Sequence, residues 1–137
     1  MNRECYYRIS VKAICFDEND RILLAREDNG MWDILGGGLE HGEEPIACLR
    51  REIQEESGLE VISISEQPKY FVTAPRLNHD TFMANVIYEV KFKDLNFTRS
   101  AECEELRYFT LKEARKEKLF PTITALIDEI ERQRSVS

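Results

Sequence analysis

The sequence predicts a mixed α/β fold in which a sheet is flanked by two main helices. Two observations lead to this class: predicted strands outnumber predicted helices, and several strands separate one helix from the other. The chain has 137 residues, of which 42% are hydrophobic. This is enough to build one core, so we expect residues 1–137 to form a single domain.

The first strands are predicted from β-forming residues that lie between turn signals. Residues 7–16 are rich in β-formers and predict a strand. Residues 17–21 (DENDR) predict a turn, and residues 21–25 a second strand. Residues 32–35 form a short apolar run that leads into three consecutive glycines, which we expect to form a loop.

Residues 44–57 predict the first helix. Pro45 suits the first helical position, and Gly58 suits the C-terminal cap. The apolar residues of this helix, Ile46, Leu49 and Ile53, project onto one stripe at about 100° per residue. This stripe is the face that we expect to be buried.

The second half of the chain predicts further strands and one long helix. Residues 61–72 are mostly extended, although Pro68 interrupts them, and residues 106–110 predict a short strand. Residues 81–90 alternate and predict a strand with one buried face, which carries Phe82, Ala84, Val86, Tyr88 and Val90. Residues 122–134 predict an amphipathic helix whose inward side carries Ile123, Leu126, Ile127 and Ile130.

Composition excludes several classes of function. No run of about 18 apolar residues is present, so no membrane span is predicted. The first ten residues, MNRECYYRIS, lack the apolar core of a signal peptide, and we expect a cytoplasmic protein with reduced cysteines. The net charge of −7 argues against tight binding to a long nucleic acid. A small anionic ligand would need a local cation.

One feature of the first helix is electrostatically unfavourable. Glu52, Glu55 and Glu56 lie at i, i+3 and i+4, where like charges repel by about 0.2–0.5 kcal/mol per pair. They also lie near the helix C-terminus, where the dipole disfavours anions. One explanation is a solvated surface on which Arg51 pairs with Glu55. The other is a divalent metal site, since hard cations prefer carboxylate oxygens.

The glycines favour the metal site. All six lie between residues 30 and 58, and the stretch ILGGGLEHGEE directly precedes the helix. Glycines let backbone amides and carbonyls approach a phosphate or a metal closely. The loop and the helix therefore combine into one motif with a fixed spacing.

This motif resembles the Nudix box of the Nudix (MutT-like) hydrolases. All nine defined positions match over 23 residues: Gly37, Glu43, Arg51, Glu52, Ile53, Glu55, Glu56, Gly58 and Leu59. The resemblance covers nearly the whole chain and is strongest over residues 32–59. The one departure is Leu35, where many relatives have proline before the glycines.

The resemblance implies a Nudix α/β/α sandwich and a site for Mg²⁺, with Mn²⁺ as an alternative. The implied metal ligands are the Gly36 carbonyl and the carboxylates of Glu52, Glu55 and Glu56. A further acid from a later loop often completes the site in relatives. Glu102 is favoured for this role, with Glu104 and Glu105 as alternatives.

The implied reaction is the hydrolysis of a pyrophosphate bond in a nucleoside diphosphate linked to another group, or in a nucleoside triphosphate, by attack of water at phosphorus. Glu52 or Glu55 would be the general base, and the residues alone do not choose between them. Arg51, with Glu43, would orient the catalytic helix. The backbone of Gly37 and Gly38 would bind the diphosphate of a small nucleotide substrate.

Several features stay open at this stage. A Nudix-like module that senses a nucleotide without cleaving it, and an enzyme that processes RNA 5′ ends, are the alternative functions. Many relatives are dimers, so a homodimer is an open alternative to a monomer. Aromatic residues that could stack on a base, although most should be core, are Trp32, Tyr70, Phe71, Phe82 and Tyr88.

Overall fold

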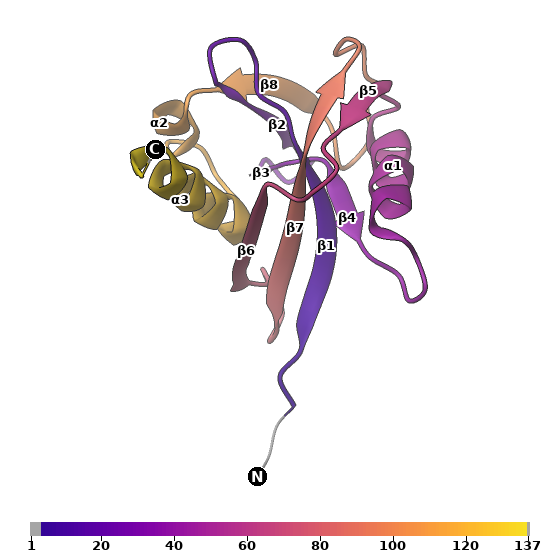
Figure 1. The fold of residues 1–137 in the computed structure, drawn as a ribbon, viewed down its shortest axis with the longest axis vertical. Helices are drawn as coiled ribbons and strands as arrows, with labels where there is room; N and C mark the ends of the chain where they lie inside the picture. The colour runs from indigo at the N-terminus through magenta and orange to yellow at the C-terminus, as the bar shows by residue number, and fades with distance from the viewer. Residues whose placement is uncertain (1–3, 137) are drawn as a thin grey trace.

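The computed structural model describes residues 4–136 and shows a twisted mixed sheet between two helices (Figure 1). Helix α1 lies on one side of the strands and helix α3 on the other, which confirms the predicted α/β/α arrangement. The elements in chain order are β1 (Tyr7–Ile14), β2 (Ile22–Arg26), β3 (Trp32–Asp33), β4 (Gly36–Gly38), α1 (Pro45–Glu56), β5 (Val61–Ile64), β6 (Tyr70–Pro75), β7 (Phe82–Phe92), β8 (Glu105–Phe109), α2 (Leu111–Ala114) and α3 (Pro121–Ser135).

The larger sheet is organised around β1 and β7, which pair in parallel from Tyr7 opposite Phe82 to Ile14 opposite Glu89. Strand β4 pairs antiparallel with the other edge of β1, while β6 and β5 pair with successive halves of β7. A second sheet has the order β3-β2-β8. Among the described residues, 4–136, no helix is long and apolar enough to cross a membrane.

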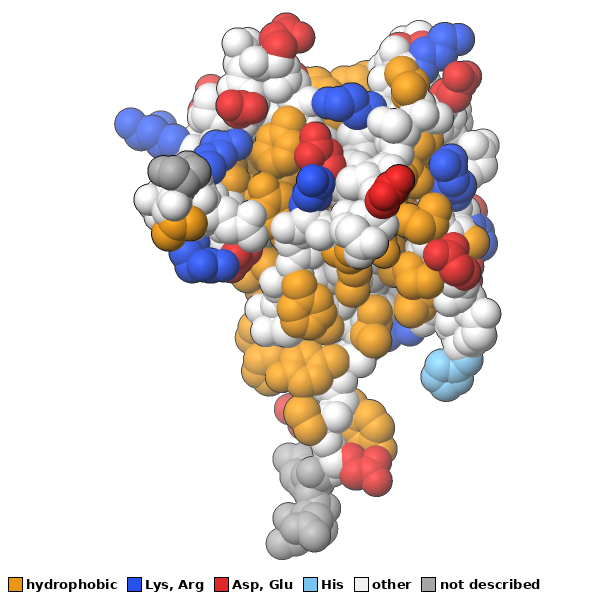
Figure 2. Space-filling view, in the orientation of Figure 1, with side chains coloured by type: hydrophobic (Ala, Val, Ile, Leu, Met, Phe, Trp, Pro, Cys, Tyr) orange, Lys and Arg blue, Asp and Glu red, His pale blue; other side chains and the backbone are white. Residues whose placement is uncertain are grey.

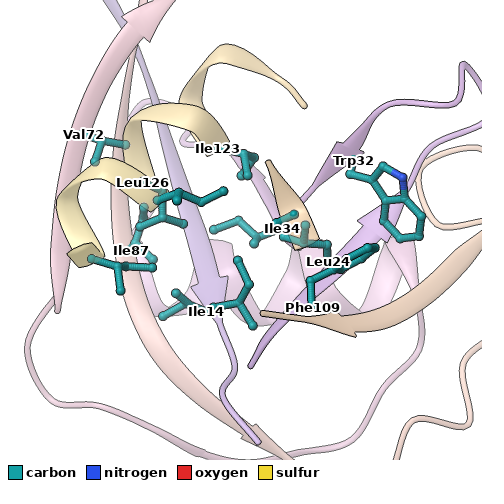
Figure 3. Packing of buried hydrophobic residues seen from close by; sticks show 13 residues of the cluster. Ile14, Leu24, Trp32, Ile34, Val72, Ile87, Phe109, Ile123 and Leu126 are labelled. Atoms are coloured by element: carbon teal, nitrogen blue, oxygen red, sulfur yellow. The ribbon is translucent and has the colours of Figure 1, made fainter. Parts of the chain in front are cut away.

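Two clusters of buried side chains hold the layers together. The first lies between the larger sheet and α3 and includes Ile14, Ile87 and Trp32 (Figure 3). The four inward-facing residues predicted for α3, namely Ile123, Leu126, Ile127 and Ile130, are all fully buried in it. The second cluster packs Cys48, Leu49 and Ile53 of α1 against the opposite side of the sheet.

Local signals at both ends of α1 confirm the predicted helix. Pro45 occupies the first turn, and the Glu44 side chain accepts a hydrogen bond from the Ala47 amide at 2.9 Å. Gly58 has a φ of +68°, and its amide bonds to carbonyls of the last turn. Glu44 and Ser57, predicted as helix ends, are the caps of a helix that runs from Pro45 to Glu56.

The structure corrects some expectations about the elements and refines others. The three glycines form strand β4 rather than a loop, because β1 supplies a pairing edge. Residues 61–72 form β5 and the start of β6, and the interruption expected at Pro68 lies between these two strands. Strand β7 extends to Phe92 and is covered on both faces, so Asn85 and Ile87 are buried as well as Ala84, while Phe82 is 48% exposed. The short helix α2 was not predicted, although Thr110 begins it with a capping box.

Hydrophobic side chains are exposed on one part of the surface. Figure 2 shows them gathered over the lower strands of the larger sheet. The exposed large hydrophobic residues of the described chain are Tyr6, Tyr7, Ile9, Ile62, Phe71, Phe82 and Val136. The Tyr7 and Phe82 rings are 6.0 Å apart between centroids. A homodimer, which the sequence left as an open alternative to a monomer, stays a prediction.

Candidate active site

The last turn of α1 is attached to the glycine strand by a buried carboxylate. Glu56 is 7% exposed, and its Oε1 accepts a hydrogen bond from the Gly36 amide at 2.8 Å. Ser100 Oγ donates to the Glu56 carbonyl at 2.6 Å, which ties the loop after β7 to the same turn. One of the three clustered acids is therefore built into the junction of α1, β4 and a distant loop.

The glycines of β4 are required because groups from other elements approach the backbone of this strand closely. A Cβ atom added at Gly37 would lie 2.5 Å from Cδ of Glu52, so the missing side chain lets that carboxylate rest against the strand backbone. At Gly38 the same space is filled by the guanidinium of Arg8, which donates from Nη1 to the Leu39 carbonyl at 2.8 Å. The backbone of this strand therefore lies beside the Glu52 carboxylate and the Arg8 guanidinium.

Arg51 offsets much of the repulsion between the acids. Its Nε and Nη2 donate to the two oxygens of Glu43 at 2.8 and 3.0 Å, a bidentate pair. Its Nη1 donates to Glu52 at 3.1 Å and to Glu55 at 3.3 Å. The Arg51 guanidinium lowers the pKa of the Glu43 carboxyl to about 2. The Arg51–Glu43 pair that the sequence predicted is present, and one guanidinium bonds three carboxylates.

A buried lysine lies on the other side of the glycine strand. Lys12 is 8% exposed, and its Nζ donates to Asp33 Oδ2 at 3.2 Å, to the Ile34 carbonyl at 3.3 Å and to the Gly36 carbonyl at 3.1 Å. Burial acts to lower the pKa of Lys12, but the charges of Asp33 and Glu56 outweigh it and raise the pKa. The ammonium therefore stays charged beside the acids.

Two carboxyls near Lys12 hold their protons unusually tightly. Burial raises the pKa of Glu56 to about 8, against the opposing effects of Lys12 and the Gly36 amide. Burial and the Asp33 charge raise the pKa of Glu27 to about 7. Glu102 contributes to both shifts through its negative charge, so it lies within electrostatic range of both groups. Both carboxyls therefore remain protonated to a higher pH than an exposed glutamate does.

The three acids of the later loop have different surroundings. Glu104 pairs with Arg99, and Glu105 pairs with Arg26 at 3.2 Å and Arg107 at 2.8 Å. Glu102 is exposed, and its charge acts on Glu56. The structure thus brings Glu102 toward the box acids, whereas Glu104 and Glu105 form ion pairs with arginines.

The donor chemistry suits a hard divalent cation. Carboxylate oxygens and a backbone carbonyl are the ligands such ions prefer, and the raised pKa of Glu56 indicates a place where added positive charge is favourable. Within residues 4–136, however, no three acidic, histidine or cysteine side chains converge around one point. Arg51 and the Gly36 amide donate hydrogen bonds to the carboxylates. Lys12 donates to the Gly36 carbonyl oxygen, which retains a second lone pair.

The raised pKa of Glu56 predicts how stability depends on pH. Between about pH 5 and 8 the folded protein retains a proton that the unfolded chain releases near pH 4.5, so stability falls as pH rises, by up to about 1.4 kcal/mol per unit. Glu27 adds to the slope in the lower part of this window. The depressed pKa of Glu43 acts only below about pH 4.5 and does not contribute.

The measurement is urea unfolding of chelator-treated protein at about pH 5, 6, 7 and 8, the window over which the linkage acts. Glu56→Gln should flatten the slope, because the amide cannot lose a proton. The exposed Glu66→Gln, which makes the same chemical change, should leave the slope unaltered. Equal stability of the wild-type protein at the two ends of this window would contradict the assignment.

Sequence reasoning missed Lys12, Asp33 and Glu27. The available signal was a lysine inside the apolar run of β1, at a position where a strand buried on both faces has no reason to carry a charge.

Of the proposed stacking aromatics, Trp32 and Tyr88 are buried in the two cores, and Trp32 packs edge-on against Phe109. A wide hollow of about 830 Å³ beside Cys15 and Tyr108 is lined by none of the box residues.

Comparisons with known proteins agree with the fold and the motif. A family model described as NUDIX domain matches residues 6–129. The solution structure of the Escherichia coli ORF135 protein superposes with a TM-score of 0.74 at 22% identity and covers 96% of this chain and 94% of that one. At this level of identity the superposition demonstrates the fold alone.

Two curated relatives carry names that describe pyrophosphate chemistry. The NAD-capped RNA hydrolase NudC of Vibrio parahaemolyticus is 31% identical over 99 residues, which are 70% of this chain and 36% of that relative. The RNA pyrophosphohydrolase of Bartonella henselae is 31% identical over 75 residues, which are 47% of this chain and 43% of that relative. The chain thus spans less than half the length of these relatives. Nudix hydrolases generally use divalent metal ions. By its matched domain and its fold, the chain belongs to the Nudix family of hydrolases.

Proposed function

We propose that residues 1–137 form one Nudix domain that hydrolyses a pyrophosphate bond in a nucleoside triphosphate or in a nucleoside diphosphate linked to another small group. The observation that carries this proposal is the packing of α1 on the glycine strand. It places Glu52 against Gly37 and bonds Glu56 to the Gly36 amide. Water would attack phosphorus, with Mg²⁺ as cofactor and Mn²⁺ as a substitute.

The residues that would hold the metal are Glu52, Glu55, Glu56, the Gly36 carbonyl and Glu102. A bound dication supplies positive charge for the phosphoryl oxygens on which negative charge develops. The donor set supports this assignment by its chemistry, and the buried Glu56 supports it by its raised pKa. With a net charge of −7, the protein would need such a cation to accept an anionic diphosphate.

Glu52 or Glu55 would take the proton of the attacking water. Glu56 is less suited to this role, because it is buried and committed to the Gly36 amide. The side chains of Glu52 and Glu55 are 17% and 58% exposed, and Arg51 bonds both. Arg51 would position the two carboxylates, while the backbone of Gly37 and Gly38, next to Arg8, would bind the diphosphate.

The test is a substrate panel assayed in millimolar Mg²⁺, a concentration that also fills weak oxygen-ligand sites. Nucleoside triphosphates, sugar nucleotides, ADP-ribose and dinucleotide polyphosphates are incubated, and the phosphorylated products are quantified. At least one compound should be cleaved, and chelation of the metal should remove the activity. Tight nucleotide binding without product after long incubation would instead identify a sensing module and contradict the proposal.

RNA 5′-end processing is a second candidate, favoured by the names of the two relatives. The net charge of −7 opposes it, because a long phosphate backbone requires a basic contact surface. Triphosphorylated and NAD-capped oligoribonucleotides in the same panel decide between the two. Cleavage of the oligonucleotides at a kcat/KM above that of every small nucleotide would establish the RNA substrate.

A further inference from the structure

One face of the larger sheet is only partly covered. Side chains alternate along a strand, so the registers of β1, β6 and β7 place odd-numbered residues of β1 and β6 and even-numbered residues of β7 on the same face. Helix α1 covers one half of this face, where Val11, Tyr88 and Val90 belong to its core cluster. The other half, at the start of β1 and β7 and along β6, is exposed. This exposed half, named the apolar face, consists of Tyr7, Ile9, Phe71, Thr73, Pro75 and Phe82.

The apolar face carries no charge, although the chain is rich in charged residues. Asp, Glu, Lys and Arg make up 33% of the sequence, and such residues are mostly found at the surface. A sheet face that meets water normally presents polar side chains. All six residues of the apolar face are exposed, and only Thr73 among them has an uncharged polar side chain of the kind expected there. The composition therefore indicates a surface that is covered by another molecule.

The area of the apolar face is close to what a dimer requires. Its four large side chains are 42–62% exposed: Tyr7 46%, Ile9 42%, Phe71 62% and Phe82 48%. At about 150–250 Å² for a large side chain, they leave roughly 300–500 Å² of apolar surface in water. A standard interface buries about 800 Å² on each partner, of which about 65% is apolar in homodimers. The face supplies most of the apolar part of one such interface.

The chemistry of the face selects a second copy of the chain as its partner. Two identical faces that meet about a two-fold axis place uncharged side chains against uncharged side chains, so no charge is buried without a partner. The smallest side chain, Ala84, lies between Ile9 and Thr73 in the register, and larger side chains of a second copy can pack over it. A membrane surface fits less well, because membrane-binding faces combine aromatic residues with Lys or Arg and this protein has a net charge of −7.

Polar groups border the apolar face on the side of the Nudix box. The Ile9 carbonyl accepts a hydrogen bond from the Leu39 amide at 3.0 Å, which fixes the loop after β4 beside β1. A hollow of about 430 Å³ between this loop and Ile9 is lined by residues that include Glu40 and His41. Interfaces commonly have an apolar centre and a polar rim. The loop provides such a rim on one side.

We propose that the apolar face is the interface of a symmetric homodimer in which the larger sheets of two copies pack face to face. The proposal concerns a surface outside the carboxylate site and does not depend on the proposed function. Sheets packed in this way lie about 10 Å apart, so the exposed aromatic side chains fill the space between them. Because the contact is apolar while each copy is acidic, added salt should strengthen the dimer by screening the repulsion between the copies.

The first test is sedimentation velocity of the full chain from about 1 to 200 μM, which brackets the Kd of a modest interface. The expected result is a monomer–dimer equilibrium whose Kd decreases when salt is added. A protein that stays monomeric at the highest concentration would overturn the proposal. So would assembly that continues beyond the dimer, or a dimer that salt weakens, because the latter would be held by charges.

The second test uses Ile9→Lys and Phe71→Lys, each of which places two lysines in the symmetric interface. Each should weaken the dimer by about 100-fold or more. Ile62→Lys is the matched control, because Ile62 is 64% exposed on β5, outside the apolar face, and should leave the Kd unchanged. At about 1 μM, where monomer is expected to predominate, all three variants should melt like the wild type, since the replaced side chains are exposed. An unaltered Kd in both face variants, or an equal loss in Ile62→Lys, would contradict the assignment of the face.

A third measurement needs no variant. Amide chemical shifts of wild-type protein are followed by NMR as the protein is concentrated. Resonances of β1, β6 and the first half of β7 should move, while those of α3, which covers the opposite side of the sheet, should stay in place. Dimerisation with shifts confined to other elements would place the interface elsewhere and overturn the proposal.

Discussion

Glu56→Gln should reduce kcat by about 10²–10⁴-fold on whichever nucleotide the substrate panel identifies, and Glu52→Gln should do the same. In Glu56→Gln the cause would be the loss of a negative ligand next to the phosphoryl group. In Glu52→Gln it would be the loss of a ligand or of the proton acceptor. Both side chains are packed against the glycine strand, so neither can be replaced by a neighbouring acid without moving the backbone.

The informative feature of Glu56→Gln is its combination of effects. The introduced carboxamide retains an oxygen that can accept from the Gly36 amide, and it carries no charge to bury. The variant should therefore melt at a higher temperature than wild type near pH 8, although it is nearly inactive. A carboxylate that lowers stability and is required for turnover is kept for catalysis.

The measurement combines steady-state kinetics at saturating Mg²⁺ with thermal melts at about pH 6 and pH 8, below and near the raised pKa of Glu56. Glu66→Gln serves as the control for an exposed glutamate and should keep full activity. Turnover indistinguishable from wild type in both Glu52→Gln and Glu56→Gln would refute the assignment of the box acids.

Gly36→Ala should destabilise the protein by about 2–5 kcal/mol. Gly36 has a φ of +125°, and an added Cβ would overlap the Val11 carbonyl oxygen and the Lys12 Cα of the paired strand. These are backbone atoms, which cannot move aside as a flexible side chain can. The substitution would separate β4 from β1 and disturb the bond from Gly36 to Glu56.

Gly42→Ala is the matched control, because Gly42 also has a positive φ, +82°, but its added Cβ would meet nothing within 4 Å. It should lose only about 1–2 kcal/mol from the left-handed conformation. The difference between the two variants in urea unfolding isolates the steric contribution at Gly36. Equal losses at both positions would show that close strand pairing at Gly36 is unimportant.

The site could be predicted from sequence to the extent that it is local. Pro45 and Gly58 set the ends of α1, and the i, i+3, i+4 spacing of its glutamates depends only on helical geometry. Arg51 and Glu43 are eight residues apart and meet as expected across the first turns of the helix. The spacing of the box also led to the correct family, because all of its positions lie in one continuous segment.

Contacts between distant segments were decided only by the tertiary structure. Lys12 meets Gly36 because β1 and β4 pair in one register, and a shift by one residue would turn Lys12 to the opposite face. Glu102 acts on Glu56 because its loop is tied to the end of α1, a relation that its spacing in sequence does not encode.

The sequence by itself determined the helix, its acids and the family; the tertiary structure decided which groups are buried together. Asn85 is the clearest example of the second kind. In the sequence it is one polar residue within a strand that alternates, which predicts exposure. The structure buries it, because α3 covers the second face of β7. The physical reason is that periodicity reports which side chains share a face, while burial depends on what packs against that face.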